Sequence, residues 1–121
     1  EYGDMQLIAE TVTLLRRGLG LTAEAAAGTF AEWNAGELGS FLVEITADVL
    51  RARDPESATG APLVDAILDR AGQKGTGAWT VAAALELGVA IPTVSAAVDA
   101  RVQSASKALR VEAEARLAFP R

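Results

Sequence analysis

Apolar residues near the start of the chain recur at alternating steps of three and four, and this spacing is the feature that most constrains the fold. The stripe consists of Met5, Ile8, Val12, Leu15 and Leu19. Residues at this spacing share one side of an α-helix, so the stripe predicts a helix that ends near residues 18–20. No stretch of four or more residues alternates well enough to predict a strand. We therefore expect an all-α, bundle-like domain with a long first helix and a long last helix.

Two further helices are predicted in the first half of the chain. Thr22 can cap one of them through its hydroxyl oxygen. Its expected apolar face consists of Ala26, Phe30 and Trp33, and residues 34–36 break it. The apolar face of the next helix is expected to comprise Leu38, Leu42, Ile45 and Val49.

The second half of the chain predicts three helices separated by loops. After an exposed loop at 53–61, Pro62 suits the first turn of a short helix that carries Leu63, Val64, Ile67 and Leu68 and stops at 71–72. An Ala-rich helix is expected from Trp79 to Leu87, with Gly88 as its C-terminal cap. Thr93 can cap a long final helix with the face Val94, Val98, Val102, Ala105 and Leu109.

The residue inventory excludes several kinds of chemistry. The chain has no cysteine and no histidine, so disulfides, zinc thiolates and Ser–His hydrolysis cannot occur within it. The net charge of −5 gives no long-range attraction for nucleic acid or anionic lipid. No apolar run approaches the ~20 residues of a membrane span, and we expect a cytoplasmic location. At 121 residues, a chain that opens without Met inside a helical pattern is expected to be one domain of a longer protein.

The loop Gly72-Gln73-Lys74-Gly75-Thr76-Gly77 is the most informative segment for function. Its glycines let backbone N–H groups approach a ligand, while Lys74 supplies charge and Thr76 a hydroxyl before a helix start. The spacing is not that of a P-loop. The loop predicts an anion site, and a solvated turn between helices is the alternative.

Other polar and aromatic residues allow two interpretations each. Glu1, Tyr2 and Asp4 begin the first helix and would serve either chemistry or solvation. Arg101 lies within an apolar face, where an anionic ligand or an internal carboxylate would have to pair with it. We expect Trp33 and Trp79 to be core anchors, and the charged residues from Arg110 to Arg116 to form a solvated face.

Five segments resemble 6-phosphogluconate dehydrogenases: EYGDMQ at 1–6, RGLG at 17–20, EWNAGEL at 32–38, EITAD at 44–48 and AGQKGTGAWT at 71–80. The last of these is the most diagnostic, and the resemblance continues to Arg101. The chain departs from the family pattern at Ala78, Ala90 and Asp99. None of these departures falls on a matched site residue.

The resemblance implies a large helical domain that binds substrate and forms a homodimer, preceded in the family by a dinucleotide-binding domain. It implies oxidative decarboxylation of 6-phosphogluconate to ribulose 5-phosphate with reduction of NADP, a reaction of the pentose phosphate pathway, without a metal. Glu1 matches the family's proton donor. Tyr2, Lys74, Thr76 and Arg101 match residues that hold the substrate phosphate.

The family's general-base lysine and its dinucleotide fingerprint have no counterpart within the 121 residues. We therefore expect the chain alone to be inactive, and its sequence does not decide between NADP and NAD. A helical binding or dimerisation module that keeps the scaffold without the reaction is the alternative. A related hydroxyacid dehydrogenase is less favoured, because such enzymes generally lack the Gln-Lys-Gly-Thr-Gly loop.

Overall fold

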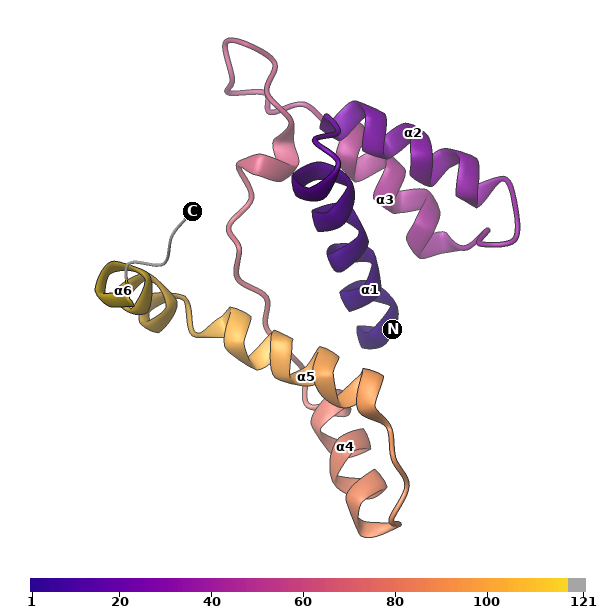
Figure 1. Ribbon diagram of the computed structural model, residues 1–121, viewed down its shortest axis with the longest axis vertical. Helices are drawn as coiled ribbons and strands as arrows, with labels where there is room; N and C mark the ends of the chain where they lie inside the picture. Colours follow the sequence, from indigo (N-terminus) through magenta and orange to yellow (C-terminus); the bar gives the residue numbers. More distant parts are fainter. Residues whose placement is uncertain (118–121) are drawn as a thin grey trace. The chain divides into compact units, whose positions relative to one another are not determined.

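The computed structural model describes residues 1–117, and within this range the protein is all-helical, as predicted (Figure 1). Its α-helices are α1 (Tyr2–Thr13), α2 (Ala23–Asn34), α3 (Phe41–Arg51), α4 (Thr76–Glu86), α5 (Pro92–Ala105) and α6 (Lys107–Leu117). A π-helical turn, η1 (Leu14–Gly18), follows α1, and a short 3-10 helix, η2 (Leu63–Asp65), lies between α3 and α4. None of the helices in the described range is long and apolar enough to cross a membrane.

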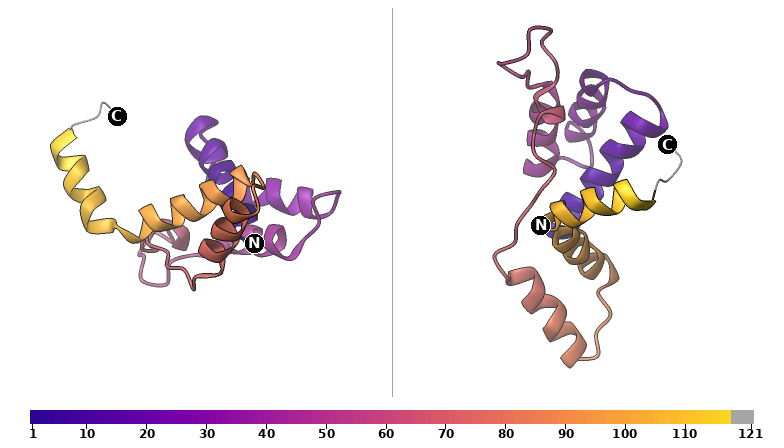
Figure 2. Two further views of the ribbon diagram at one scale, coloured as in Figure 1. Left: turned by 90° about the horizontal axis from the view of Figure 1, so that it is seen from below. Right: turned by 90° about the vertical axis from the view of Figure 1, so that its left-hand side faces the viewer.

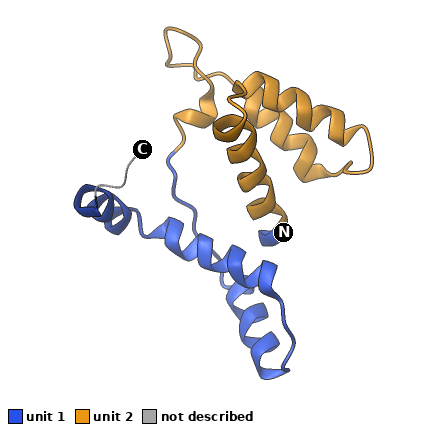
Figure 3. Ribbon diagram, viewed as in Figure 1, with its two compact units in different colours: residues 1–3, 68–121 blue, residues 4–67 orange. Residues whose placement is uncertain are grey.

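The chain divides into two compact units, which we describe separately (Figure 3). Unit 2 is the continuous segment Asp4–Ile67. Unit 1 joins Glu1–Gly3 to the part of the chain that begins at Leu68. The first residues of the sequence therefore belong with α4, α5 and α6.

Unit 2 is organised around the pair α2 and α3, which lie side by side in both views of Figure 2. Each helix begins at a hydroxyl cap: Thr22 accepts a hydrogen bond from the Ala25 N–H, and Ser40 accepts one from the Val43 N–H. Such caps satisfy N–H groups that have no partner within the helix. The buried core between the helices consists of Ala26, Ala27, Phe30, Ala47 and Leu50. Small side chains at this contact let the two helices approach closely.

The predicted faces of the first helices are partly confirmed. Ile8, Val12 and Leu15 pack against the core of unit 2, whereas Leu19 is 72% exposed and lies beyond the π-helical turn. The third helix begins later than predicted, because Ser40 caps it and leaves Leu38 in the preceding turn. Its buried residues are Ala47 and Leu50, and the predicted face residue Val49 is exposed.

The predicted helix over 63–68 is wrong except for its first residues. Only Leu63–Asp65 form a 3-10 turn, after which the chain continues without helix to α4. The Ala-rich helix, conversely, begins three residues before Trp79, at Thr76. Gly88 has a left-handed φ of 66°, as expected after a helix end.

The predicted long last helix is two helices. It breaks at Ser106, between α5 and α6, so Leu109 does not share a face with the buried Val98. Pro92 is the first residue of α5, and Thr93 lies inside the helix instead of capping it. The fixed φ of proline suits this first position and replaces the side-chain cap.

Two expectations about exposure are also corrected. Trp33 packs against the core of unit 2, as predicted. Trp79, in unit 1, is 75% exposed and is therefore not the core anchor that was predicted. In α6 the charged run is only partly solvated. Arg116 pairs with Glu112 on the surface, whereas Arg110 is half-buried and binds Asp69.

Candidate functional site: an anion pocket in unit 1

A cavity of about 450 Å³ in unit 1 contains the residues that the sequence singled out. Its lining consists of Glu1, Tyr2, Gly72, Gln73, Lys74, Thr76 and Arg101. We call it the anion pocket, because two cations and two hydroxyls line it beside a single carboxyl group. Its volume falls within the ~300–1,000 Å³ that is usual for small-molecule sites. All its residues belong to one unit.

The Gly-rich loop enters the pocket because Gly75 turns the chain into α4. Gly75 has a φ of +96° and directly precedes the helix, a conformation that residues with a Cβ rarely adopt. Thr76 is therefore the first residue of α4. The first N–H groups of a helix lack partners within it and carry partial positive charge. The loop thus presents Lys74 and a helix start to the same cavity.

Arg101 connects the loop to the first residues of the chain. This half-buried side chain donates from Nη1 to the Gly72 carbonyl oxygen at 3.0 Å. Its guanidinium also lies over the Tyr2 ring, with Cζ 4.4 Å from the ring centroid. Such a cation–π contact holds a guanidinium in place without neutralising it. These two contacts fix the Arg101 guanidinium at the wall of the pocket.

Gly77 gives the Tyr2 ring its place against α4. A Cβ built at Gly77 would lie 2.8 Å from Cε2 and 2.9 Å from Cδ2 of Tyr2, and 2.8 Å from Cγ2 of Val98. These distances are too short for non-bonded carbon atoms, so a side chain here would have to displace the ring. Gly77, which the sequence predicts to lie in a loop, is the second residue of α4.

We expect Gly77→Ala to destabilise the protein although it puts alanine into a helix. The helix propensity of alanine would add about 1 kcal/mol, whereas overpacking costs about 1–3 kcal/mol. Gly28→Ala is the matched control, because Gly28 lies in α2 with nothing within 4 Å of the added Cβ. It should stabilise by about 0.5–1 kcal/mol. Urea unfolding of both variants measures the difference, and equal stability would contradict the placement of Tyr2 against α4.

The structure brings together all five residues that the sequence analysis assigned to the site. Glu1, Tyr2, Lys74, Thr76 and Arg101 line one cavity although they come from three parts of the chain. Glu1, Lys74 and Thr76 are exposed at its surface. A second cavity of about 460 Å³ lies in unit 2, but its walls are mostly apolar and it contains no cation. An anionic ligand would be held only weakly there.

The fold and the pocket define a class of protein: a helical domain whose site suits a phosphorylated or otherwise anionic small molecule. The matching family model is described as "6-phosphogluconate dehydrogenase, C-terminal domain" and covers residues 1–121. The chain belongs to this family.

Individual relatives agree with this assignment. The chain is 55% identical over 120 residues to a NADP(+)-dependent, decarboxylating 6-phosphogluconate dehydrogenase of Bacillus subtilis, covering 99% of this chain. It is 56% identical to a decarboxylating 6-phosphogluconate dehydrogenase of Synechocystis. It also matches the solved structure of Plasmodium falciparum 6-phosphogluconate dehydrogenase, with a TM-score of 0.93 and 44% identity over 99% of this chain. In each case it spans about a quarter of the other protein's length.

Proposed function

We propose that this chain is the substrate-binding helical part of an enzyme that converts 6-phosphogluconate to ribulose 5-phosphate and carbon dioxide with reduction of NADP. The observation that carries the proposal is the anion pocket, in which a carboxyl group lies beside hydrogen-bond donors that suit a phosphate group. The reaction in this proposal is taken from the family to which the chain belongs. Because the chain spans 25% of its Bacillus subtilis relative, we assign the activity to a longer protein that contains this segment.

In the proposed role, four residues hold the substrate phosphate. Lys74 and Arg101 would supply charge-assisted hydrogen bonds, and the hydroxyls of Tyr2 and Thr76 would complete the set. Two cations and two hydroxyls can neutralise and orient a phosphate dianion. Binding energy gained at the phosphate, away from the reacting carbons, would then position those carbons.

Glu1 is the proposed acid of the last step. Oxidation at C3 of the sugar acid gives a 3-keto acid, which loses its carboxylate as carbon dioxide and leaves an enediol. Glu1 would donate a proton to C1 of this enediol to give the ketose product. A carboxyl group is one of the few acids available in a chain without histidine. Its place in the same cavity as the phosphate donors supports this role.

NADP supplies the hydride acceptor when bound to the longer enzyme. Within residues 1–117 no strand precedes a Gly-rich turn and helix, the arrangement that usually holds a dinucleotide. A homodimer is also part of the proposal, and it is supported by exposed apolar side chains on and after α4, such as Trp79, Leu85 and Leu87.

The decisive experiment uses the full-length protein that contains this segment. We expect NADPH and carbon dioxide to form in equal amounts from 6-phosphogluconate, and sedimentation velocity to report a dimer. Lys74→Ala should raise KM for 6-phosphogluconate by about 10- to 100-fold, the loss expected for a hydrogen bond to a charged group. Arg116→Ala is the control, since it removes the same charge from the exposed surface of α6. Its KM should equal that of the parent.

Absence of turnover with both NADP and NAD would overturn the catalytic proposal. If inorganic phosphate still bound in a Lys74-dependent manner, the chain would be a binding module that retains the scaffold. Equal effects of Lys74→Ala and Arg116→Ala would show that net charge, and not the pocket, determines affinity. A monomer in sedimentation would contradict the homodimer.

A further inference from the structure

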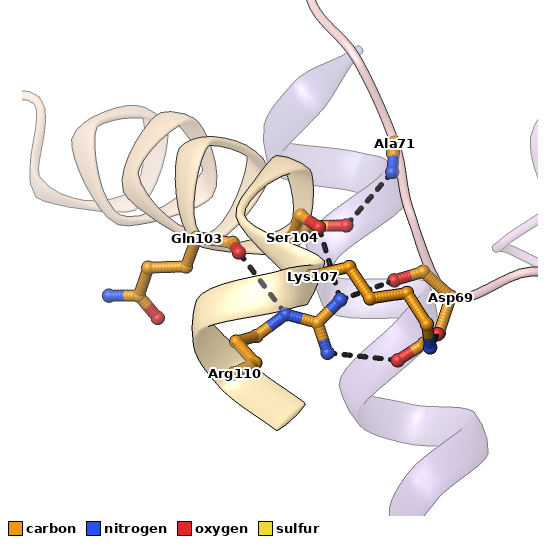
Figure 4. Close-up of polar contacts among 6 residues, drawn as sticks. All are labelled: Asp69, Ala71, Gln103, Ser104, Lys107 and Arg110. Atoms are coloured by element: carbon orange, nitrogen blue, oxygen red, sulfur yellow. Dashed lines mark hydrogen bonds and ion pairs between the residues drawn. The ribbon is translucent and has the colours of Figure 1, made fainter. Parts of the chain in front are cut away.

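The segment before the Gly-rich loop is fixed along one side of α5 and the start of α6. Arg110 donates from Nη1 to the Asp69 carboxylate at 2.9 Å and from Nη2 to the Asp69 carbonyl oxygen at 2.7 Å (Figure 4). Lys107 binds the same carboxylate. Two cations thus hold both the side chain and the backbone of one residue in a segment that has no helix of its own.

The next residues of the segment continue this contact toward the pocket. The Ala71 N–H donates to Ser104 Oγ at 2.9 Å, and the Gly72 carbonyl accepts from Arg101 Nη1 at 3.0 Å. The partners in the helices are Lys107, Ser104 and Arg101, which are spaced three residues apart. The segment 69–72 therefore runs in the opposite chain direction to α5 and the start of α6. Its last hydrogen bond is made by Arg101, a residue of the anion pocket.

Arg110 also fixes the bend between the two helices. It donates from Nε to the Gln103 carbonyl at 3.2 Å and from Nη2 to the Ser104 carbonyl at 3.1 Å (Figure 4). These oxygens lie in the last turn of α5, and the Gln103 carbonyl also accepts from the Ser106 N–H at 3.1 Å. One guanidinium thus joins the bend at Ser106 to Asp69. The hydrogen bonds from Lys107 and then Arg110 lower the pKa of Asp69 to about 2, so its carboxylate stays charged well below neutral pH.

We infer that Asp69 is a positioning residue for the anion pocket, acting with Ser104, Lys107 and Arg110 as a group that we call the Asp69 cluster. The cluster sets the register of 69–72 along α5, and this register determines where Lys74 lies relative to Arg101. A displacement of about 1 Å in groups that position a substrate can reduce the rate about 10²-fold. The Asp69 carboxylate is exposed, and ion pairs at exposed carboxylates contribute little to folding, so the main effect of changing Asp69 should appear in ligand binding.

The inference rests on the proposed function and is tested in the same full-length enzyme. Asp69→Asn should raise KM for 6-phosphogluconate and the inhibition constant of inorganic phosphate by about tenfold, with kcat and the KM for NADP unchanged. Asp69→Glu keeps the charge and should restore part of the affinity. Ser104→Ala breaks only the middle bond and should give a smaller shift, about threefold, in the same direction.

The matched control is Asp65→Asn in unit 2. Asp65 makes a two-bond ion pair with Arg16 at 2.6 and 2.9 Å and is 48% exposed, against 59% for Asp69. The same chemical change should leave KM and phosphate inhibition unaltered. If the two Asn variants gave equal shifts in melting temperature and no change in KM, Asp69 would be structural only and the inference would be wrong.

The design separates failure of the inference from failure of the proposed function. If Lys74→Ala weakens phosphate inhibition and neither Asp69→Asn nor Ser104→Ala does, only the positioning role is overturned. If Lys74→Ala also has no effect, the pocket does not bind phosphate and the proposed function falls with it.

Discussion

Replacement of Glu1 by glutamine in the full-length enzyme is expected to lower kcat by about 10²–10⁴-fold, the usual contribution of a general acid. The amide keeps the shape of the carboxyl group but cannot give up a proton as a carboxylic acid does. Because the substrate phosphate would still be held by its donors, KM should change little. NADPH should form normally in the first turnover, while ribulose 5-phosphate should appear slowly. Single-turnover mixing with separate detection of the two products measures this split.

Glu10→Gln is the control for this prediction. Glu10 lies on α1, the helix that begins directly after Glu1, where it accepts a hydrogen bond from Gln6, and it does not line the anion pocket. Its kcat should match that of the parent. Slow NADPH formation in the first turnover of Glu1→Gln would mean that Glu1 acts before the enediol is formed, and the proton-donor role would have to be abandoned.

Phe30→Ala is expected to reduce the free energy of unfolding by about 3–5 kcal/mol, because it removes a large buried side chain and leaves a cavity. Phe30 is 2% exposed in the core between α2 and α3. Its ring meets that of Trp33 edge-on, with centroids 5.2 Å apart. Such a loss is a large part of the ~5–15 kcal/mol that stabilises a typical domain. Urea titration of the 121-residue chain, followed by circular dichroism, measures it.

Phe41→Ala provides the comparison, since Phe41 is 72% exposed. The same truncation at an exposed position should change the free energy of unfolding by no more than about 0.5 kcal/mol. A loss below about 1 kcal/mol for Phe30→Ala would contradict the packing of α2 on α3, because it would fall short even of a single buried methylene pair.

The helices could be predicted where the sequence carries local signals. Thr22 is followed by a regular apolar face, and its helix begins where expected. The break at Ser106 could not be predicted, because apolar spacing continues across it without Gly or Pro. At the break, Arg110 of the next helix binds the carbonyls at the end of α5, and apolar spacing does not show such a contact. The start of α3 was predicted too early, because Leu38 fits the apolar spacing although it is exposed and precedes the helix. The N-cap is Ser40.

The site could be predicted further than the contacts that hold it. The Gly-rich loop and the awkward Arg101 indicated an anion site, and the resemblance added Glu1 and Tyr2. The Asp69 cluster was missed, because its charges are far apart in sequence and resemble solvated surface residues. Gly77 was assigned to the loop because the side chains that it contacts, those of Tyr2 and Val98, are also distant in the sequence. The residues around Gly77 in the sequence do not show that a glycine is needed there, because the ring that it accommodates belongs to Tyr2, at the start of the chain.

The loop between α3 and η2 offers a place to lengthen the protein. Backbone hydrogen bonds from Asp54 to Ala61 and from Leu63 to Ala52, each 2.9 Å long, close its base. The tip beyond this closure belongs to unit 2 and contributes no residue to the anion pocket. Doubling the length of such a closed loop costs only about 0.6 kcal/mol of chain entropy. We therefore expect an epitope or a fluorescent reporter inserted between Ser57 and Gly60 to leave the anion pocket intact.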